Sequence, residues 1–593
     1  MLRSFAHTAV AACLLAPLAG CATHQEADVS PAPGASPTLT RFGSDEAFMR
    51  YQRRMLRDWE AYIRRNPPLS EAPQPVEPPP LGRPPPRGEP VDAIDLAGVH
   101  EPGIVKATRG HLLALVGGRL NAVRIGGGAL APAGSVEAGG RSILAAGDMV
   151  MGIGGGWDEM DVELWRLGEA GEITPTGTYQ LRANRRTVRE GGSSFRLVDG
   201  KLVVYTPIGF WARDTAAIPL LLPAVRRTHP AGDTTWRPLA APADIFRPSG
   251  RMRADDETTF HVVTVCDPAG GELDCRATVV YAPEPVAHHV SRTAVYVHAF
   301  QRPDSSTANP HDRFAIYRIP LDGGVPTALG ITGLPENARS FAETADGRLD
   351  VLLRATLLRV PLASFGDGSL TAPPGAYTAL PVAGPGTFHN RFVGDWVLYG
   401  VDSGLNHRGT LEKGRVFAAR RDGATNPVPL PLPPGQYDGL LGIEAMGAGA
   451  LVTGESPDSL HYYPVRLGDT AAASEPFARP GRWTGDIDAH AVFYHPEDED
   501  RGIVGVALSN YGATASVLFL RNEGFRLSQA GELAATVPPG TECPSCGHYA
   551  YALPIFVQGR IFALVGPELV EGVMENGRIR ELRRIRLETA PAQ

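Results

Sequence analysis

The stretch FRLVDGKLVVY, residues 195–205, decides the fold. Two runs of strand-forming residues flank Asp199-Gly200, and Asp-Gly between such runs is a strong signal for a two-residue hairpin turn. A second hairpin is expected where Val162–Leu167 is followed by the polar turn 168–172 and a further strand. Strand, turn and strand, repeated once, predict a unit of four antiparallel strands.

This unit recurs along the chain at a spacing of about 40–60 residues, which is typical of a β-propeller rather than a sandwich. We therefore predict an all-β fold, a β-propeller of four-stranded blades over residues 91–593. Eight or nine blades are expected, and seven would also be compatible. The 68 Gly and 54 Pro fit many turns and little helix. Hairpins are expected to start near Ile104, Ile143, Phe195, His289, Phe341, His389, Gly442, His490 and Pro554.

One short amphipathic helix is expected before the propeller, over residues 45–66. Ser44 provides a cap, Asp45-Glu46 an acidic first turn, and Pro67-Pro68 an end. The helix either packs on the main domain or docks on another protein. Residues 67–90 are rich in proline and predict an extended, semi-rigid linker. The apolar stripe consists of Phe48, Tyr51, Met55, Trp59, Tyr62 and Ile63.

The N-terminus has the pattern of an export signal, because Arg3 precedes a short apolar stretch and small residues. Leu18-Ala19-Gly20-Cys21 resembles the lipobox of bacterial lipoproteins, in which the cysteine carries the lipid. The resemblance implies a signal peptide over residues 1–20, a lipid on Cys21 and a tether over residues 21–44. It places the protein in the cell envelope, and Ala22 favours the outer membrane, on its periplasmic or surface side. A signal peptide with an unrelated cysteine is the alternative.

The charge of the chain argues against a nucleic-acid partner. The formal net charge is −8, and removal of residues 1–20, which carry one Arg and no acid, makes it about −9. Nucleic-acid-binding domains are normally basic or carry a basic face. We therefore exclude that class of protein.

Two motifs resemble the secreted bacterial and archaeal "beta-propeller domain" proteins. The first is LTRFGSDE at residues 39–46, before the helix, and the second is GVHEPGIVK at residues 98–106. The second motif of that family usually has an acid where this chain has His100, which puts any role of that acid in doubt here. The resemblance implies a propeller and a secreted location, and it provides no catalytic residues.

Cys266 and Cys275 flank the turn-forming stretch 267–271, DPAGG. An oxidising envelope favours disulfides. We expect these two cysteines to join the two outer strands of one blade.

Cys543-Pro544-Ser545-Cys546 allows more than one interpretation. A redox dithiol needs a helix N-terminus to lower the thiol pKa, whereas the surrounding residues predict a loop. A metal site with His548 would need further ligands. A haem site needs His directly after Cys546, where Gly547 stands. A tight structural disulfide is the favoured interpretation.

Two other candidate sites are weaker. His490 and His495, with Asp488 and the acidic run Glu497–Asp500, resemble a metal site, but two His five residues apart on a strand point to opposite faces. We expect a solvated loop there and no metal. The glycines of 152–156 could hold phosphate only if a helix followed. A blade loop is expected instead.

These features lead to two functional hypotheses. The first is a non-catalytic binding or scaffolding lipoprotein of the cell envelope, with an envelope protein or glycan as partner and no cofactor. The alternative is a hydrolase or lyase with its site in the propeller channel. No Gly-x-Ser-x-Gly and no His-Glu-x-x-His motif occurs. A quinone-dependent dehydrogenase is disfavoured, because the seven Trp are irregularly scattered. An enzyme should show several titratable groups converging in the channel.

Overall fold

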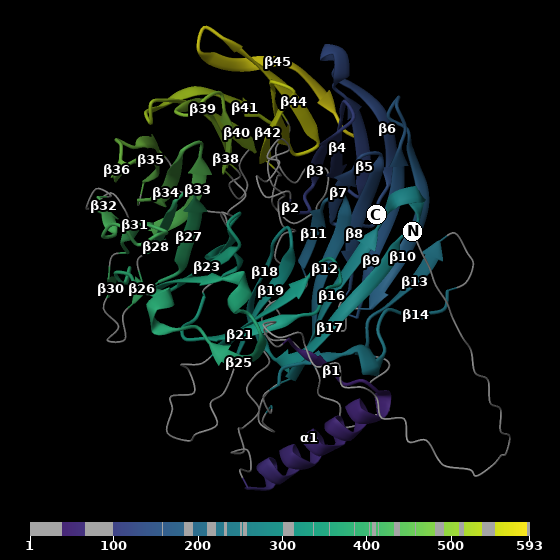
Figure 1. Ribbon diagram of the computed structural model, residues 1–593. Helices are drawn as coiled ribbons and strands as arrows, with labels where there is room; N and C mark the ends of the chain where they lie inside the picture. Colours follow the sequence, from purple (N-terminus) through teal and green to yellow (C-terminus); the bar gives the residue numbers. More distant parts are fainter. Residues whose placement is uncertain are drawn as a thin grey trace, which may run out of the picture.

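The computed structural model describes residues 38–65, 99–156, 158–182, 194–209, 221–229, 234–249, 252, 258–300, 314–335, 337–354, 356–384, 386–402, 404–405, 411–412, 414–431, 439–456, 458–480, 492–508, 515–536 and 552–589. Within these residues, nine units of four antiparallel strands form a ring (Figure 1). The first strand of each unit lies toward the centre and the fourth toward the rim (Figure 1). The predicted all-β propeller is confirmed, with nine blades, which we name A to I.

The first five blades use strands from residues 105–379. Blade A consists of β3 (Val105–Thr108), β4 (His111–Val116), β5 (Arg119–Arg124) and β6 (Ala131–Glu137). Blade B has β7 (Ser142–Ala146), β8 (Met149–Gly155), β9 (Glu159–Leu167) and β10 (Ile173–Arg182). Blade C has β11 (Ser194–Val198), β12 (Lys201–Gly209), β16 (Thr258–Asp267) and β17 (Asp274–Pro283). Blade D has β18 (Pro285–Val290), β19 (Ala294–Phe300), β20 (Phe314–Pro320) and β21 (Thr327–Ile331). Blade E has β22 (Phe341–Glu343), β23 (Arg348–Leu353), β24 (Thr356–Pro361) and β26 (Tyr377–Ala379).

The remaining four blades complete the ring. Blade F consists of β27 (Phe388–Val393), β28 (Trp396–Val401), β31 (Val416–Arg420) and β32 (Val428–Leu430). Blade G has β33 (Gly439–Met446), β34 (Gly449–Glu455), β35 (Ser459–Leu467) and β36 (Ala471–Ala473). Blade H has β38 (Val492–Pro496), β39 (Arg501–Leu508), β40 (Ser516–Glu523) and β41 (Leu527–Ala534). Blade I has β42 (Ala552–Val557), β43 (Arg560–Val565), β44 (Glu568–Glu575) and β45 (Arg578–Arg586).

The hairpin of residues 195–205 forms as the sequence predicts. Phe195 pairs with Val204, and Val198 pairs with Lys201. Asp199 and Gly200 have φ angles of 47° and 77°, and two positive φ angles suit the tight turn that matches strand twist. The turns between first and second strands, and between third and fourth strands, lie on one face of the ring, which we call the tight-turn face.

Apolar side chains between neighbouring blades form the core. Separate clusters join A to B, B to C, and so on around the ring to H. One further cluster combines residues of blades H, I and A, including Phe519, Phe556 and Leu112, and so closes the ring. Since burying one large apolar side chain stabilises a fold by about 1.5–3 kcal/mol, blade stacking dominates the stability.

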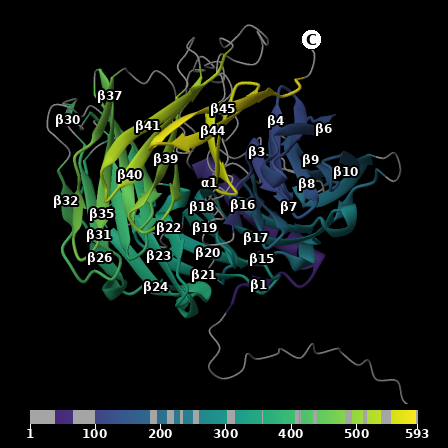
Figure 2. The same cartoon turned by 90° about the horizontal axis from the view of Figure 1, so that it is seen from above.

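The first and last blades meet at a seam (Figure 2), and no strand among the described residues is shared between them. Arg560 of blade I donates from Nη1 to the Ile125 carbonyl at 2.6 Å and from Nη2 to the Ala129 carbonyl at 2.8 Å. The carboxylate of Glu571, which is buried, binds both Arg560 and Arg583. The seam therefore combines an apolar interior with the hydrogen bonds and ion pairs of Arg560 and Glu571.

The N-terminal part of the described chain packs on blade C. The helix α1 (Asp45–Arg65) begins after Ser44, whose Oγ accepts from the Ala47 N–H at 3.1 Å. Phe48, Tyr51 and Met55 are buried against blade C, so these three residues of the stripe pack on the main domain. Beside the helix, β1 (Thr40–Arg41) pairs with β15 (Phe246–Arg247), which pairs with β17 (Figure 1). No helix among the described residues is both long and apolar enough to span a bilayer.

Candidate functional site

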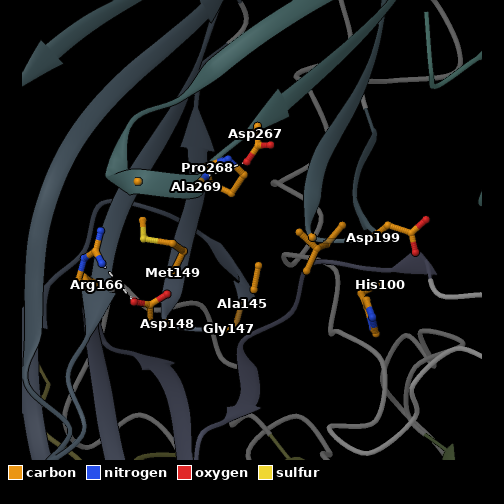
Figure 3. Close-up of a pocket in the computed structure, with 14 residues that line it drawn as sticks. His100, Ala145, Gly147, Asp148, Met149, Arg166, Asp199, Asp267, Pro268 and Ala269 are labelled. Carbon is orange, nitrogen blue, oxygen red and sulfur yellow. Dashed lines mark hydrogen bonds and ion pairs between the residues drawn. The ribbon is translucent and has the colours of Figure 1, made fainter.

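A cavity of about 570 Å³ opens between blades B and C on the tight-turn face (Figure 3). Three turns surround it: the β7–β8 turn of blade B, and the β11–β12 and β16–β17 turns of blade C. His100, from β2 (Val99–His100), completes the wall, because β2 pairs with β11. This volume lies in the range of small-molecule sites.

Each turn presents an aspartate to the cavity. Asp148 follows Gly147 in blade B, and Asp199 occupies the hairpin turn of blade C. Asp267 begins the β16–β17 turn, and its Oδ1 accepts from the Ala269 N–H at 2.9 Å. Aspartate is common in turns because its side chain can accept hydrogen bonds from nearby backbone N–H groups, and this explains its presence in all three turns.

The aspartates in the first hairpin turns of blades B and C both bind arginines. Asp148 accepts from Arg166 Nη1 of its own blade at 3.2 Å and lies 3.9 Å from Arg109 Nη2 of blade A. Asp199 forms an ion pair of 3.2 Å with Arg292 of blade D. Arg166 itself lines the cavity, and Figure 3 shows the Arg166–Asp148 contact on one side with His100 and Asp199 on the other.

Cys266 and Cys275 flank the β16–β17 turn, which forms part of the cavity wall. Their sulfurs are 2.00 Å apart, at disulfide distance, with Cα atoms 4.0 Å apart. They are cross-strand partners in β16 and β17, the outer strands of blade C, as the sequence suggested. The cross-link encloses the segment from Asp267 to Gly270 that lines the cavity.

A second group of polar side chains lies on the inner strands of the ring. Arg196 of β11 forms an ion pair with Glu101. His289 of β18 lies 3.1 Å from the Ala338 carbonyl through Nδ1, which implies that Nδ1 carries the proton and Nε2 accepts. Burial, with Arg196 as a further cause, lowers the pKa of His289 to about 4. Arg196 and Glu101 therefore lie close enough to His289 to influence its pKa.

The polar contacts continue around the inner strands to blade G. Arg339, before β22, binds the Glu444 carboxylate of β33 at 2.7 Å. Arg391 of β27 lies 3.9 Å from the same carboxylate, and Asn390 Nδ2 donates to the Arg339 carbonyl at 2.8 Å. These groups bind one another, so the arrangement also explains how the inner strands are held in register.

Of the other candidate sites from the sequence, some lie within the described residues and some outside them. His495 lies in β38 and stacks on Phe556 with ring centroids 5.1 Å apart. The acidic run 497–500 is a turn in which Glu497 binds Arg521 and Asp498 binds Arg501. No group of three or more potential metal-binding side chains occurs in the described part of the chain. Cys21, Cys543, Cys546, His548, Asp488 and His490 lie outside the described residues.

The expected blade loop at 152–156 was wrong. Residues 152–155 belong to strand β8, which pairs with β7 and β9. A Cβ on Gly152 would lie 2.5 Å from Cη2 of Trp165, so glycine is needed for close packing. The glycine run reflects tight sheet packing rather than a phosphate loop.

Sequence reasoning missed most residues of the cavity and of the inner strands. Asp199 and Asp267 were noticed only as turn residues, and Asp148, Arg166 and Arg196 were not singled out. A signal for Asp148 and Asp199 was present in the sequence. Both stand in the first hairpin turn of their blades, and equivalent turns of neighbouring blades lie on the same face of the ring. The unusual His100 of the second motif also lines this cavity.

The comparisons with known proteins identify no family. No family model and no curated protein matches the chain. Among solved structures, dihydro-haem d1 dehydrogenase NirN is 12% identical, with a TM-score of 0.33, over 73% of this chain and 74% of that one. A proposed 6-phosphogluconolactonase from Bacteroides fragilis is 12% identical, with a TM-score of 0.28, over 57% and 93%. The WD40 domain of Toxoplasma gondii coronin is 11% identical, with a TM-score of 0.26, over 51% and 70%. Because these TM-scores are all low, we base no conclusion about fold or activity on these likenesses.

Proposed function

We propose that this protein is a lipid-anchored binding module of the bacterial cell envelope, whose ligand site is the cavity between blades B and C. The observation that carries the proposal is that cavity itself, in which two of three lining aspartates bind arginines and the Cys266–Cys275 pair closes one wall. Rigid, preformed concave sites favour binding, because little ordering is needed when the ligand enters. The lipid on Cys21 and the tether would hold this site near a membrane.

The test uses a variant that fills the cavity. Ala269 is exposed and lines the cavity, so Ala269→Trp should block it without disturbing the core. Ala424→Trp is the matched control, because Ala424 is also exposed and its N–H donates to Asp422 Oδ1 at 3.0 Å, as Ala269 does to Asp267. The immobilised full chain is exposed to fractionated envelope extract. Retention of a component by wild type and Ala424→Trp, and its loss with Ala269→Trp, is the expected result.

The result that overturns this proposal is turnover of an envelope glycan or peptide without retention at the cavity. That result would favour the second candidate, a hydrolase acting at the inner strands. The observation in favour of the second candidate is His289, which is neutral above about pH 4 and has an accepting Nε2 beside the Arg196–Glu101 pair. His289→Gln should then abolish turnover, whereas Ala269→Trp should leave it unchanged.

A further inference from the structure

We propose that the cavity between blades B and C takes a neutral polyhydroxylated ligand, a mono- or disaccharide unit of an envelope glycan. The inference rests on the proposed binding function and names the ligand class of the same site.

The charge balance of the cavity favours a neutral ligand. Three aspartates line the cavity, Asp148, Asp199 and Asp267. Three guanidinium groups bind two of them: Arg166, which lines the cavity, and Arg109 bind Asp148, and Arg292 binds Asp199. A cationic ligand would compete with arginines already in place, and an anionic ligand would meet three carboxylates. The formal balance of zero leaves neutral molecules as the best match.

The hydrogen-bonding groups in the wall match hydroxyl groups. Carboxylates that are fixed by arginine keep lone pairs and accept hydrogen bonds from hydroxyls. The Arg166 guanidinium and the backbone N–H groups of the turns can donate to hydroxyl oxygens. Because a hydroxyl both donates and accepts, several hydroxyls on one ring can satisfy this mixed set.

Apolar groups lie between these polar ones. Met149 and Leu197 are buried in the wall, and Pro268 lines the cavity beside Asp267. A sugar ring has carbon-bound hydrogens on its faces and hydroxyls on its edge, so it can contact both kinds of wall. A cavity of about 570 Å³ also has the size of a site for such a ligand.

The wall is held in place before a ligand enters. The Cys266–Cys275 link closes the turn from Asp267 onward, and Thr108 Oγ1 of blade A donates to the Gly147 carbonyl at 2.5 Å. The tight turn at Asp199-Gly200 has little freedom. Weakly binding, fully hydrated ligands such as sugars depend on this kind of preorganisation.

The experiment is calorimetric titration of the full chain in an amine-oxide detergent, which has no sugar headgroup. The neutral probes are cellobiose, maltose and N,N′-diacetylchitobiose. The charged probes are digalacturonic acid and the disaccharide of glucosamine. We expect at least one neutral probe to bind, Ala269→Trp to raise its Kd about tenfold or more, and Ala424→Trp to leave it unchanged.

Three results would overturn the inference. If neutral probes bind Ala269→Trp as well as wild type, their site is not this cavity. If only charged probes bind in a manner sensitive to Ala269→Trp, the ligand class is wrong and the binding function stands. If none of the five probes binds while retention of an envelope component still depends on Ala269, the glycan inference fails alone. If wild type retains no envelope component either, the proposed function fails as well.

Discussion

Asn121 and Glu588 join the first blade of the ring to the segment that follows the last one, through two reciprocal hydrogen bonds. Asn121 Nδ2 donates to the Glu588 carbonyl at 3.0 Å, and the Glu588 N–H donates to Asn121 Oδ1 at 3.0 Å. Asn121 is buried. The side-chain amide of Asn121 thus pairs with the backbone of residue 588 much as a neighbouring strand would, in addition to the Arg560 contacts and the apolar cluster of the seam.

Asn121→Leu should therefore weaken the seam. The variant keeps the side-chain size and leaves the Glu588 backbone groups unpaired, at a cost of about 1–3 kcal/mol. Hydrogen exchange should increase in β3–β5 and β43–β45 and stay unchanged in blades D to F. Asn522→Leu is the control, since Asn522 Nδ2 donates to groups within blade H. Equal exchange around the whole ring in Asn121→Leu would contradict this role.

The Cys266–Cys275 link should contribute modestly to stability. The enclosed loop is short, so Cys266→Ser with Cys275→Ser should cost on the order of 2–3 kcal/mol and leave the fold intact. The Tm of the double variant against wild type, with the circular dichroism spectrum as a check on the fold, measures this. An unchanged Tm, or a loss of the β spectrum, would show that the estimate is wrong.

The pairing of the remaining cysteines is open to direct measurement. Mass spectrometry of the non-reduced protein should show the linkages 266–275 and 543–546. Closure of the smaller ring between Cys543 and Cys546 should affect stability less than the 266–275 link. Free thiols at 543 and 546, or a metal released by a chelator, would instead favour the redox or metal interpretation of that motif.

Acid should destabilise the protein through buried histidines. His261 Nε2 donates to the Pro283 carbonyl at 2.9 Å and Nδ1 accepts from the Tyr205 hydroxyl at 2.9 Å. Burial lowers the pKa of His261 to about 4, whereas the unfolded value is about 6.5. Between these two pKa values, His261 is protonated in the unfolded chain and neutral in the folded chain. The stability that is present above about pH 6.5 is therefore lost as the pH falls toward 4. For His261 the loss is about 3 kcal/mol.

The Tm measured at about pH 7 and about pH 5 tests this expectation. The Gln side chain of His261→Gln can still donate to the Pro283 carbonyl but does not take up a proton in this pH range. The Tm of this variant should therefore be lower than that of wild type at neutral pH, because the fit of the imidazole is lost, and should depend less on pH. The same steep decrease in wild type and His261→Gln would mean that other groups cause the acid sensitivity.

Cys21→Ser should release the protein from the membrane or stall its processing. The expectation follows from the Leu18–Cys21 sequence. Membrane fractionation and the mass of the mature N-terminus provide the measurement. A Cys21→Ser protein that stays in the membrane fraction and is cleaved at the same bond would rule out the lipid anchor.

The repeat was predictable from the sequence because it depends on local chemistry. Asp199-Gly200 dictates one turn, and the remaining hairpins start beside or within the first strands of blades A to I, with His490 itself outside the described residues. The helix was predictable for the same reason: Ser44 and the stripe at Phe48, Tyr51 and Met55 are local signals. Its partner, blade C, was not, because packing across long sequence separations leaves no local trace.

The cavity could not be predicted because it depends on how two blades stack. Asp148 and Asp199 belong to different blades, and their arginines come from blades A, B and D. His100 joins them only because Val99 and His100 pair with Val198 and Leu197. No pattern within any one blade contains this arrangement.

The seam has a consequence for biosynthesis. Blade A is made before blade I, and each contributes apolar side chains to the same cluster. During synthesis, the face of blade A that will meet blade I has no partner until residues near 586 have been made. A chain truncated before blade I would therefore expose a wide apolar surface, the kind that chaperones hold and proteases recognise. Since ring closure depends on blade I, chains that lack this blade differ from closed ones in the apolar surface that they expose.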